Sequence, residues 1–119
     1  MDEDLEIVKI LALLTIHPNA PPPGGYGRTP IHWAVNHGHT EIVKILAPLT
    51  IFPNVPDNFG DTPLHQAAFY GYTDIVKILV PMTDFHHHSH NNYGRTPMYW
   101  ATTFGHSEIV EILLIVETY

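Results

Sequence analysis

The sequence predicts an all-α solenoid, a stack of helix–turn–helix units, because two motifs recur in one register. The first motif is Gly-X-Thr-Pro, and it stands at residues 27–30, 60–63 and 94–97. The spacings between these copies are 33 and 34 residues. The second motif is an acidic residue before an aliphatic run, and it stands at residues 6–11, 41–46, 74–79 and 108–113. Repeats of this length form stacks in which each unit buries its apolar side against its neighbours.

The first half of one unit is clearest in the middle of the chain. Asp57-Asn58-Phe59-Gly60 consists of turn-forming residues. Thr62 suits the N-cap of a helix, and Pro63 suits the first helical position, where its missing N–H has no partner to lose. These residues predict a short helix over 64–70, which Gly71 ends.

The second half of the unit is another helix, which begins at Thr73-Asp74 with an acidic side chain where the helix dipole favours it. Its apolar residues follow i, i+1, i+3, i+4 spacing and so lie on one stripe. Pro81 ends this helix. The flanking units follow the same plan, with first helices that open at Thr29-Pro30 and Thr96-Pro97.

The stretch Gly60-Asp61-Thr62-Pro63-Leu64-His65-Gln66-Ala67-Ala68, followed by Gly71 and by Ile75-Val76 to Leu79, resembles the ankyrin-repeat signature. The resemblance covers roughly residues 4 to 119. It implies an ankyrin-repeat solenoid of helix–turn–helix units with β-turn fingers. It also implies a non-enzymatic protein that binds other proteins with the fingers and the concave first-helix face. In such repeats, His32 and His65 tie the finger threonines by hydrogen bonds, whereas Tyr99 replaces this histidine in the last unit.

We expect a single domain over residues 1–119. Its parts are an N-terminal half repeat and loop (1–23), two repeats (24–56 and 57–90) and a C-terminal repeat (91–119). The half repeat has a second helix without a first, and the last helix has an apolar tail over 113–116. Because repeat stacks need polar ends, we expect a piece of a longer array or a homo-oligomer joined through exposed repeat ends. A monomer with frayed ends is the alternative.

The first helices present two faces with different patterns. One face is small or aliphatic in every unit, as close packing demands. The other varies from copy to copy and consists of Trp33, Asn36, His37, Gln66, Phe69, Tyr70, Trp100, Thr103 and Phe104. Repeats must agree where they pack and can differ where they meet a partner, and aromatic residues anchor interfaces. We therefore predict a partner-binding surface here, although Trp33, Gln66 and Trp100 can instead pack between repeats.

The fingers add three candidate contact residues. The residue after the finger glycine changes from Arg28 to Asp61 to Arg95, so it is a candidate for specific contact. Near-identical blocks such as residues 42–46 stand beside these varied positions. That contrast is typical of an engineered binder on a repeat scaffold, and recent natural duplication produces the same pattern.

A histidine cluster precedes the last finger and consists of His86, His87, His88 and His90. Imidazoles at this spacing can chelate Zn, Ni or Cu. The simpler interpretation is a solvated polar loop with adventitious affinity for Zn or Ni. We expect no other cofactor.

The composition argues against several other classes of protein. The 119 residues carry a net charge of -7, and the basic residues are spread over the repeats, whereas nucleic-acid binding needs clusters of them. No apolar run approaches the roughly 20 residues that a bilayer crossing requires. The N-terminal Met1-Asp2-Glu3-Asp4 is acidic where a signal peptide is basic. We expect no nucleic-acid or membrane partner, and a cytoplasmic or recombinant soluble protein without a targeting signal.

Catalytic chemistry is not evident in the sequence. The chain has no cysteine, and Ser89 and Ser107 lack the glycine-flanked context of a serine nucleophile. Most carboxylates stand at helix starts, where capping explains them. We therefore predict non-catalytic protein–protein recognition. The alternatives are a self-assembling repeat scaffold and a metal-dependent binder or assembly that uses the loop histidines.

Overall fold

The computed structural model describes residues 29–49, 54–82 and 90–117. Their helices are α2 (Pro30–Asn36), α3 (Thr40–Leu49), α4 (Pro63–Tyr70), α5 (Thr73–Leu79), the short 3-10 helix η1 (Val80–Met82), α6 (Pro97–Thr103) and α7 (Ser107–Glu117). These described segments contain no strand, so the expected all-α class is confirmed. The predicted half repeat over 1–23 lies outside the described residues.

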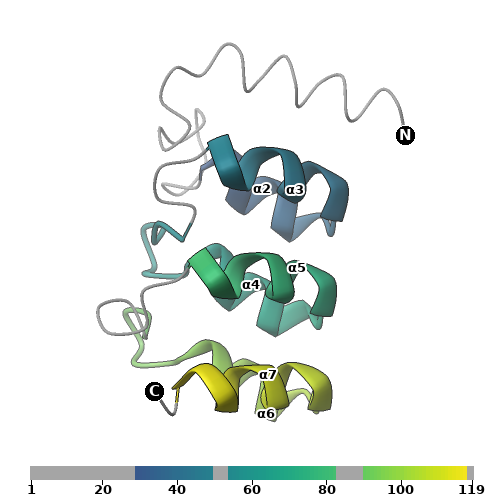
Figure 1. Cartoon of the computed structure of the whole chain (residues 1–119). Coiled ribbons are helices and arrows are strands. Elements are labelled where there is room, and N and C mark those ends of the chain that lie inside the picture. Colours follow the sequence, from purple (N-terminus) through teal and green to yellow (C-terminus); the bar gives the residue numbers. More distant parts are fainter. Residues whose placement is uncertain (1–28, 50–53, 83–89, 118–119) are drawn as a thin grey trace.

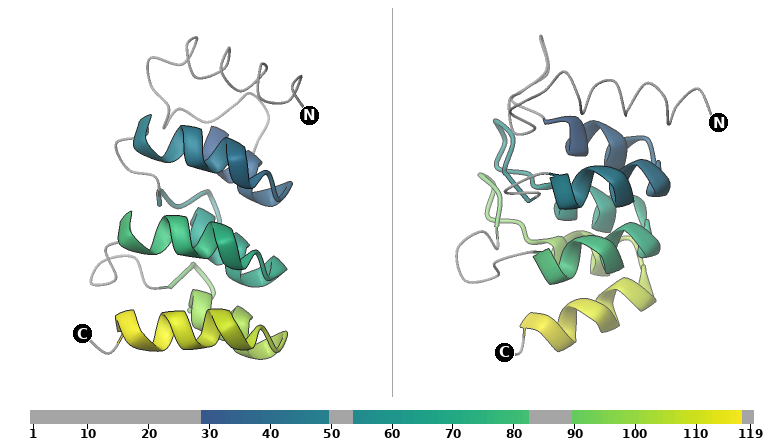
Figure 2. Two further views of the ribbon diagram at one scale, coloured as in Figure 1. Left: turned by 45° about the vertical axis from the view of Figure 1, so that its right-hand side comes forward. Right: turned by 45° about the horizontal axis from the view of Figure 1, so that its top comes forward.

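The helices form three hairpins that stack in one direction (Figure 1). The first helices α2, α4 and α6 pack in one column, and the second helices α3, α5 and α7 pack in another. The two further views in Figure 2 show the same three tiers. The predicted solenoid of helix–turn–helix units is therefore confirmed for this part of the chain.

Each first helix has a threonine as its N-cap. Thr29, Thr62 and Thr96 have extended backbone, and each hydroxyl accepts a hydrogen bond from the backbone N–H three residues later. The following proline occupies the first turn, where its missing N–H costs nothing. The helix expected over 64–70 begins one residue earlier, at Pro63.

The core lies between the stacked hairpins and is aliphatic. Its first-helix members are Ile31, Ala34, Val35, Leu64, Ala67, Ala68 and Ala101, all nearly inaccessible to solvent. The second helices add the Ile, Val and Leu residues of their repeated motif. At α6 the expected packing face is incomplete: Met98 is only partly buried and Thr102 is exposed. Within the described residues no further hairpin covers them.

Two fingers precede α4 and α6, and both close in the same way. The N–H of Asp57 donates to the carbonyl of Asp61 at 2.9 Å, and the N–H of Asn91 donates to that of Arg95 at 2.8 Å. In each finger the Oδ1 of the first residue also accepts two backbone N–H groups, at 2.9 to 3.0 Å. Asp57 and Asn91 therefore accept the same pair of backbone hydrogen bonds, although one side chain is a carboxyl group and the other is an amide.

The fingers also bind each other. The N–H of Asn92 donates to the carbonyl of Phe59 at 2.9 Å, and its side-chain amide donates to the carbonyl of Asn58 at 3.0 Å. This close approach is possible because Gly60 has no side chain. A Cβ there would lie 2.7 Å from the backbone nitrogen of Asn92, and the φ of Gly60 is +80°.

Gly94 offers a matched control for this contact. Its φ is +73°, but a Cβ there would meet nothing within 4 Å. We expect Gly94→Ala to lower the free energy of unfolding by about 1 kcal/mol, the cost of a left-handed residue. Gly60→Ala adds overpacking against the next finger, so we expect a loss of about 3 kcal/mol. Chemical denaturation of both variants checks the difference, and equal losses would contradict the finger contact.

Candidate protein-binding surface

A buried histidine connects α2 to the finger before α4, and another connects α4 to the finger before α6. The Nδ1 of His65 lies 3.2 Å from the backbone nitrogen of Thr62 and 2.8 Å from its hydroxyl. The Nε2 lies 3.0 Å from the carbonyl oxygen of Arg95. An N–H can only donate, so Nδ1 accepts and Nε2 carries the proton that goes to Arg95.

His32 repeats this arrangement one unit earlier. Its Nδ1 lies 3.1 Å from the backbone nitrogen of Thr29, and its Nε2 lies 2.9 Å from the carbonyl oxygen of Asp61. The expected role of both histidines in tying the finger threonines is confirmed. In the last unit, Tyr99 has no ring nitrogen, and Thr96 is left with the backbone N–H of Tyr99 as its capping donor. This connection between helix and finger holds Asp61 and Arg95 beside the first helices.

Burial lowers the pKa of His65 below its ordinary value of 6.5. The bond to the Arg95 carbonyl and the carboxylates of Asp61 and Asp57 raise the pKa, but desolvation outweighs them. The neutral imidazole is therefore favoured, which agrees with the acceptor role of Nδ1.

Four aromatic side chains on α4 and α6 form one group, which we call the Phe69 cluster: Phe69, Tyr70, Trp100 and Phe104. The ring of Phe69 is the centre, with centroid distances of 4.9 Å to Tyr70, 5.0 Å to Trp100 and 5.0 Å to Phe104. All three contacts are edge-to-face, the favourable geometry for aromatic pairs. Phe69, Tyr70 and Phe104 are 37, 44 and 50% exposed.

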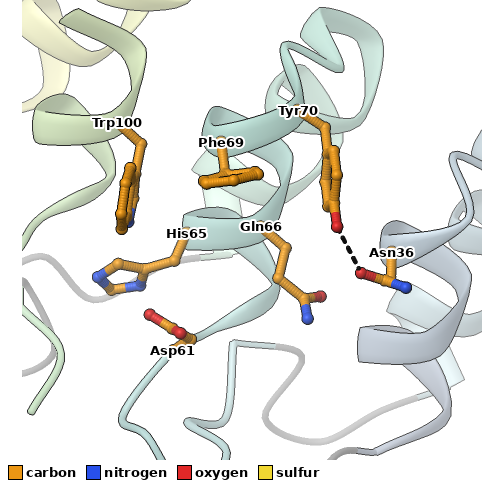
Figure 3. A pocket seen from close by; sticks show the side chains of 7 residues that line it. All are labelled: Asn36, Asp61, His65, Gln66, Phe69, Tyr70 and Trp100. Carbon is orange, nitrogen blue, oxygen red and sulfur yellow. Dashed lines mark hydrogen bonds between the residues drawn. The ribbon is translucent and has the colours of Figure 1, made fainter. Parts of the chain in front are cut away.

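A pocket of about 170 Å³ lies beside this cluster and is lined by residues of α2, α4, α6 and a finger (Figure 3). The residues that line it are Asn36, Asp61, His65, Gln66, Phe69, Tyr70 and Trp100. The Tyr70 hydroxyl donates to the Oδ1 of Asn36 at 3.1 Å and so joins two repeats at the pocket. Six of these residues belong to the predicted binding set. His65 does not, because the sequence indicated only a structural role for it.

Gln66 follows the alternative in which it packs between repeats, although it belongs to the varying face of the first helices. It is only 7% exposed, and neither atom of its amide has a hydrogen-bond partner among the residues that the structure describes. The same register position holds Trp33 in the unit before, which is 45% exposed. Gln66 is buried because α4 lies between α2 and α6, whereas α2 and α6 each have such a neighbour on one side within the described residues.

Comparison with protein families decides the class of this fold. A family model for ankyrin repeats, in three copies, matches residues 1–88 and 52–118. The chain belongs to the ankyrin-repeat family. Ankyrin repeats are in general protein–protein interaction modules, and the family is typically non-catalytic. A search among curated proteins gave no match.

In this ankyrin-repeat protein, some predicted contact residues are not part of the Phe69 cluster. Trp33 stacks on His37 with ring centroids 4.2 Å apart and forms a separate aromatic pair on α2. Thr103 is exposed and donates its hydroxyl to the carbonyl of Tyr99 at 2.6 Å. The predicted residue Arg28 lies outside the described segments.

The two remaining finger residues carry opposite charges at the edge of the surface. The guanidinium of Arg95 lies 5.3 Å from the ring centroid of Trp100, within cation–π range. Asp61 accepts a hydrogen bond from the side-chain amide of Asn91 at 2.8 Å. Tyr93, the aromatic residue before Gly94, is 68% exposed, although no sequence pattern singled it out.

The metal prediction falls mainly on undescribed residues. His86, His87 and His88 lie outside the described segments, and His90 is exposed. Among the residues that the structure describes, no group of three or more His, Asp or Glu side chains is placed to hold a metal ion. The histidine site therefore stays a prediction. None of the described helices combines the length and apolar character needed to cross a membrane.

The lowered pKa of His65 makes stability depend on pH. In the unfolded chain this histidine binds a proton as pH falls below 6.5, whereas the folded chain resists protonation. The contribution of His65 is thus fully present above pH 6.5 and is lost as pH falls toward the lowered value. We expect acidification from about pH 7.5 to pH 5 to destabilise the wild type more than His65→Gln, which does not titrate. Urea unfolding of both proteins across this range measures the difference, and parallel curves would contradict it.

Proposed function

We propose that this chain is a non-catalytic module that binds a protein partner through its first helices and fingers. The observation that carries the proposal is the Phe69 cluster, in which large rings from two adjacent repeats stay exposed side by side. Apolar rings in water carry a cost that a polar side chain would avoid. Contiguous exposed apolar groups of this kind mark interaction sites.

The geometry of the cluster suits tight binding. Each ring is already held by its neighbours, so a partner would order few additional rotamers. Aromatic side chains give a large contact area with only two side-chain torsions. The adjacent pocket would receive a protruding side chain, as the central pockets of many interfaces do.

The charges at the edge of the surface would orient the partner. Asp61 and Arg95 stand on successive fingers, so the surface presents a carboxylate and a guanidinium one repeat apart. Such rim charges affect association rate and register more than affinity. A partner with the complementary order of charges would therefore dock in one direction along the stack.

Removal of the central rings tests this proposal. We expect Phe69→Ala combined with Phe104→Ala to weaken partner binding by about 2 to 4 kcal/mol, since such anchors dominate interface energy. The chain serves as bait to isolate a partner, which is then titrated against the purified variants.

Met82→Ala is the matched control, because Met82 is an exposed apolar residue on η1, which follows the second helix α5. It should bind as the wild type does. Equal binding by the double variant, with its fold intact by circular dichroism, would refute the surface.

Self-assembly is the second candidate, and the outer side of α7 favours it. Leu114 and Ile115 are 55 and 65% exposed on the same helix. Two adjacent aliphatic residues at this exposure could pair with a second copy of the chain. The metal-dependent alternative has no comparable support among the described residues.

Charge substitution separates self-assembly from partner binding. We expect Ile115→Lys to shift any concentration-dependent association toward monomer, because a second copy would have to bury its ammonium group. Sedimentation equilibrium over a range of concentrations measures the mass. A wild type that stays monomeric throughout would remove this candidate and leave partner binding through the Phe69 cluster untouched.

A further inference from the structure

We propose that the pocket beside Gln66 binds a side-chain carboxamide, an Asn or Gln residue, of the protein partner. This inference rests on the proposed function and specifies the chemistry that the surface recognises. It starts from the buried amide of Gln66, whose nitrogen and oxygen have no hydrogen-bond partner within the described part of the chain. An unmet buried donor or acceptor costs roughly 1 to 3 kcal/mol, so a ligand that satisfies both would recover a substantial free energy.

The placement of this amide directs it to the pocket. Gln66 projects from the middle of α4, and its amide lies between the side chains of Asp61 and Asn36 (Figure 3). Phe69 and Trp100 provide flat apolar walls on the other side of the same pocket. A planar polar group on a short apolar stem would meet the Gln66 amide with its polar edge and the two rings with its apolar part.

The amide of Gln66 offers one hydrogen-bond donor and one acceptor, and this pair favours a neutral ligand over a charged one. A carboxylate ligand offers no donor for the Gln66 oxygen and is repelled by Asp61. A cationic ligand offers no acceptor for the Gln66 nitrogen. A primary carboxamide presents one N–H and one C=O on the same edge, so it can pair with both atoms of Gln66 at once. A hydroxyl group carries its donor and acceptor on one atom and cannot form this pair of parallel hydrogen bonds, so the carboxamide is the neutral side chain that fits best.

The register of the repeats supports a special role for this position. Trp33 and Trp100 occupy it in the neighbouring units. A third aromatic or an aliphatic side chain would fill the space without an unmet polar group. The one polar exception is also the copy enclosed by hairpins on both sides, where an unpaired amide is most costly.

The pocket beside the amide carries one exposed hydrogen bond, between Tyr70 and Asn36. Both amide atoms lie out of reach of solvent, and the hydrogen bond from Tyr70 to Asn36 joins two lining side chains. Rotation of the Tyr70 side chain would break this bond and separate two of the side chains that line the pocket. Tyr70→Phe removes the bond while it keeps the ring, so we expect this variant to bind the carboxamide at least as well as the wild type.

Four probes with the same ring test the chemistry. They are benzamide, N-methylbenzamide, benzamidine and benzoate. In N-methylbenzamide a methyl group replaces the N–H on the carbonyl edge, so the paired contact with Gln66 is lost. Each probe is titrated into ¹⁵N-labelled protein, and the Gln66 side-chain amide and the Trp100 indole N–H are followed by NMR. The side-chain amide of Asn54, whose oxygen accepts from the Leu64 N–H away from the pocket, is the internal control.

We expect benzamide to bind with a dissociation constant of about a millimolar, as its size allows. Its advantage over each of the other three probes should be about tenfold, the contribution of two neutral hydrogen bonds. Tighter binding of benzamidine would assign the pocket to a cation at Asp61 and overturn the proposal. Equal binding of N-methylbenzamide, or binding of none of the four, would overturn it as well.

Gln66→Met is the matched variant, because methionine has a similar length and no hydrogen-bonding amide. It should lose the preference for benzamide, as judged from the Trp100 signal. It should also unfold at a temperature about 3 °C higher, because an unpaired polar group is removed. A lower unfolding temperature would mean that the amide is satisfied in the free protein, and the proposal would fail.

The outcome is separable from that of the proposed function. A chain that captures a protein through the Phe69 cluster but prefers none of the amide probes would keep its function and lose only this site.

Discussion

The bond from each buried histidine to a main-chain carbonyl of the next finger is the interaction on which the rest of the stack depends. His65 accepts from the threonine that caps its own helix and donates to Arg95 of the following unit. One ring thus fixes where a helix begins and where the next finger lies. His32 does the same one unit earlier, so two consecutive fingers stand at equivalent positions.

This rigid scaffold is what allows the outward side of the first helices to vary. The aliphatic residues between hairpins are almost fully buried and nearly uniform, whereas the outward residues range from Asn36 to Phe104. Because the scaffold sets their spacing, rings from separate repeats meet in one cluster. The proposed binding surface is therefore a property of the stack, since no single hairpin carries the whole of it.

The fold was largely predictable from the sequence, and the details of the surface were not. Thr62, Pro63 and Gly71 act through local backbone chemistry, so their roles follow from residue type and position. The burial of Gln66 depends on how closely α2 and α6 approach α4, which the sequence does not state. The meeting of Phe69 with Trp100 likewise depends on side-chain rotamers across two repeats. Position along a helix predicted which residues share a side, but not which of them touch.

The histidine bond has one more consequence for the fingers. His32 and His65 contact the backbone oxygens of Asp61 and Arg95, and they make the same bond although these two side chains carry opposite charges. This bond between units thus does not depend on which side chain follows the finger glycine. A substitution at this position can therefore keep the histidine bond, although at Asp61 it would remove the side-chain hydrogen bond from Asn91. A protein assembled in this way can acquire a new specificity while its architecture stays the same.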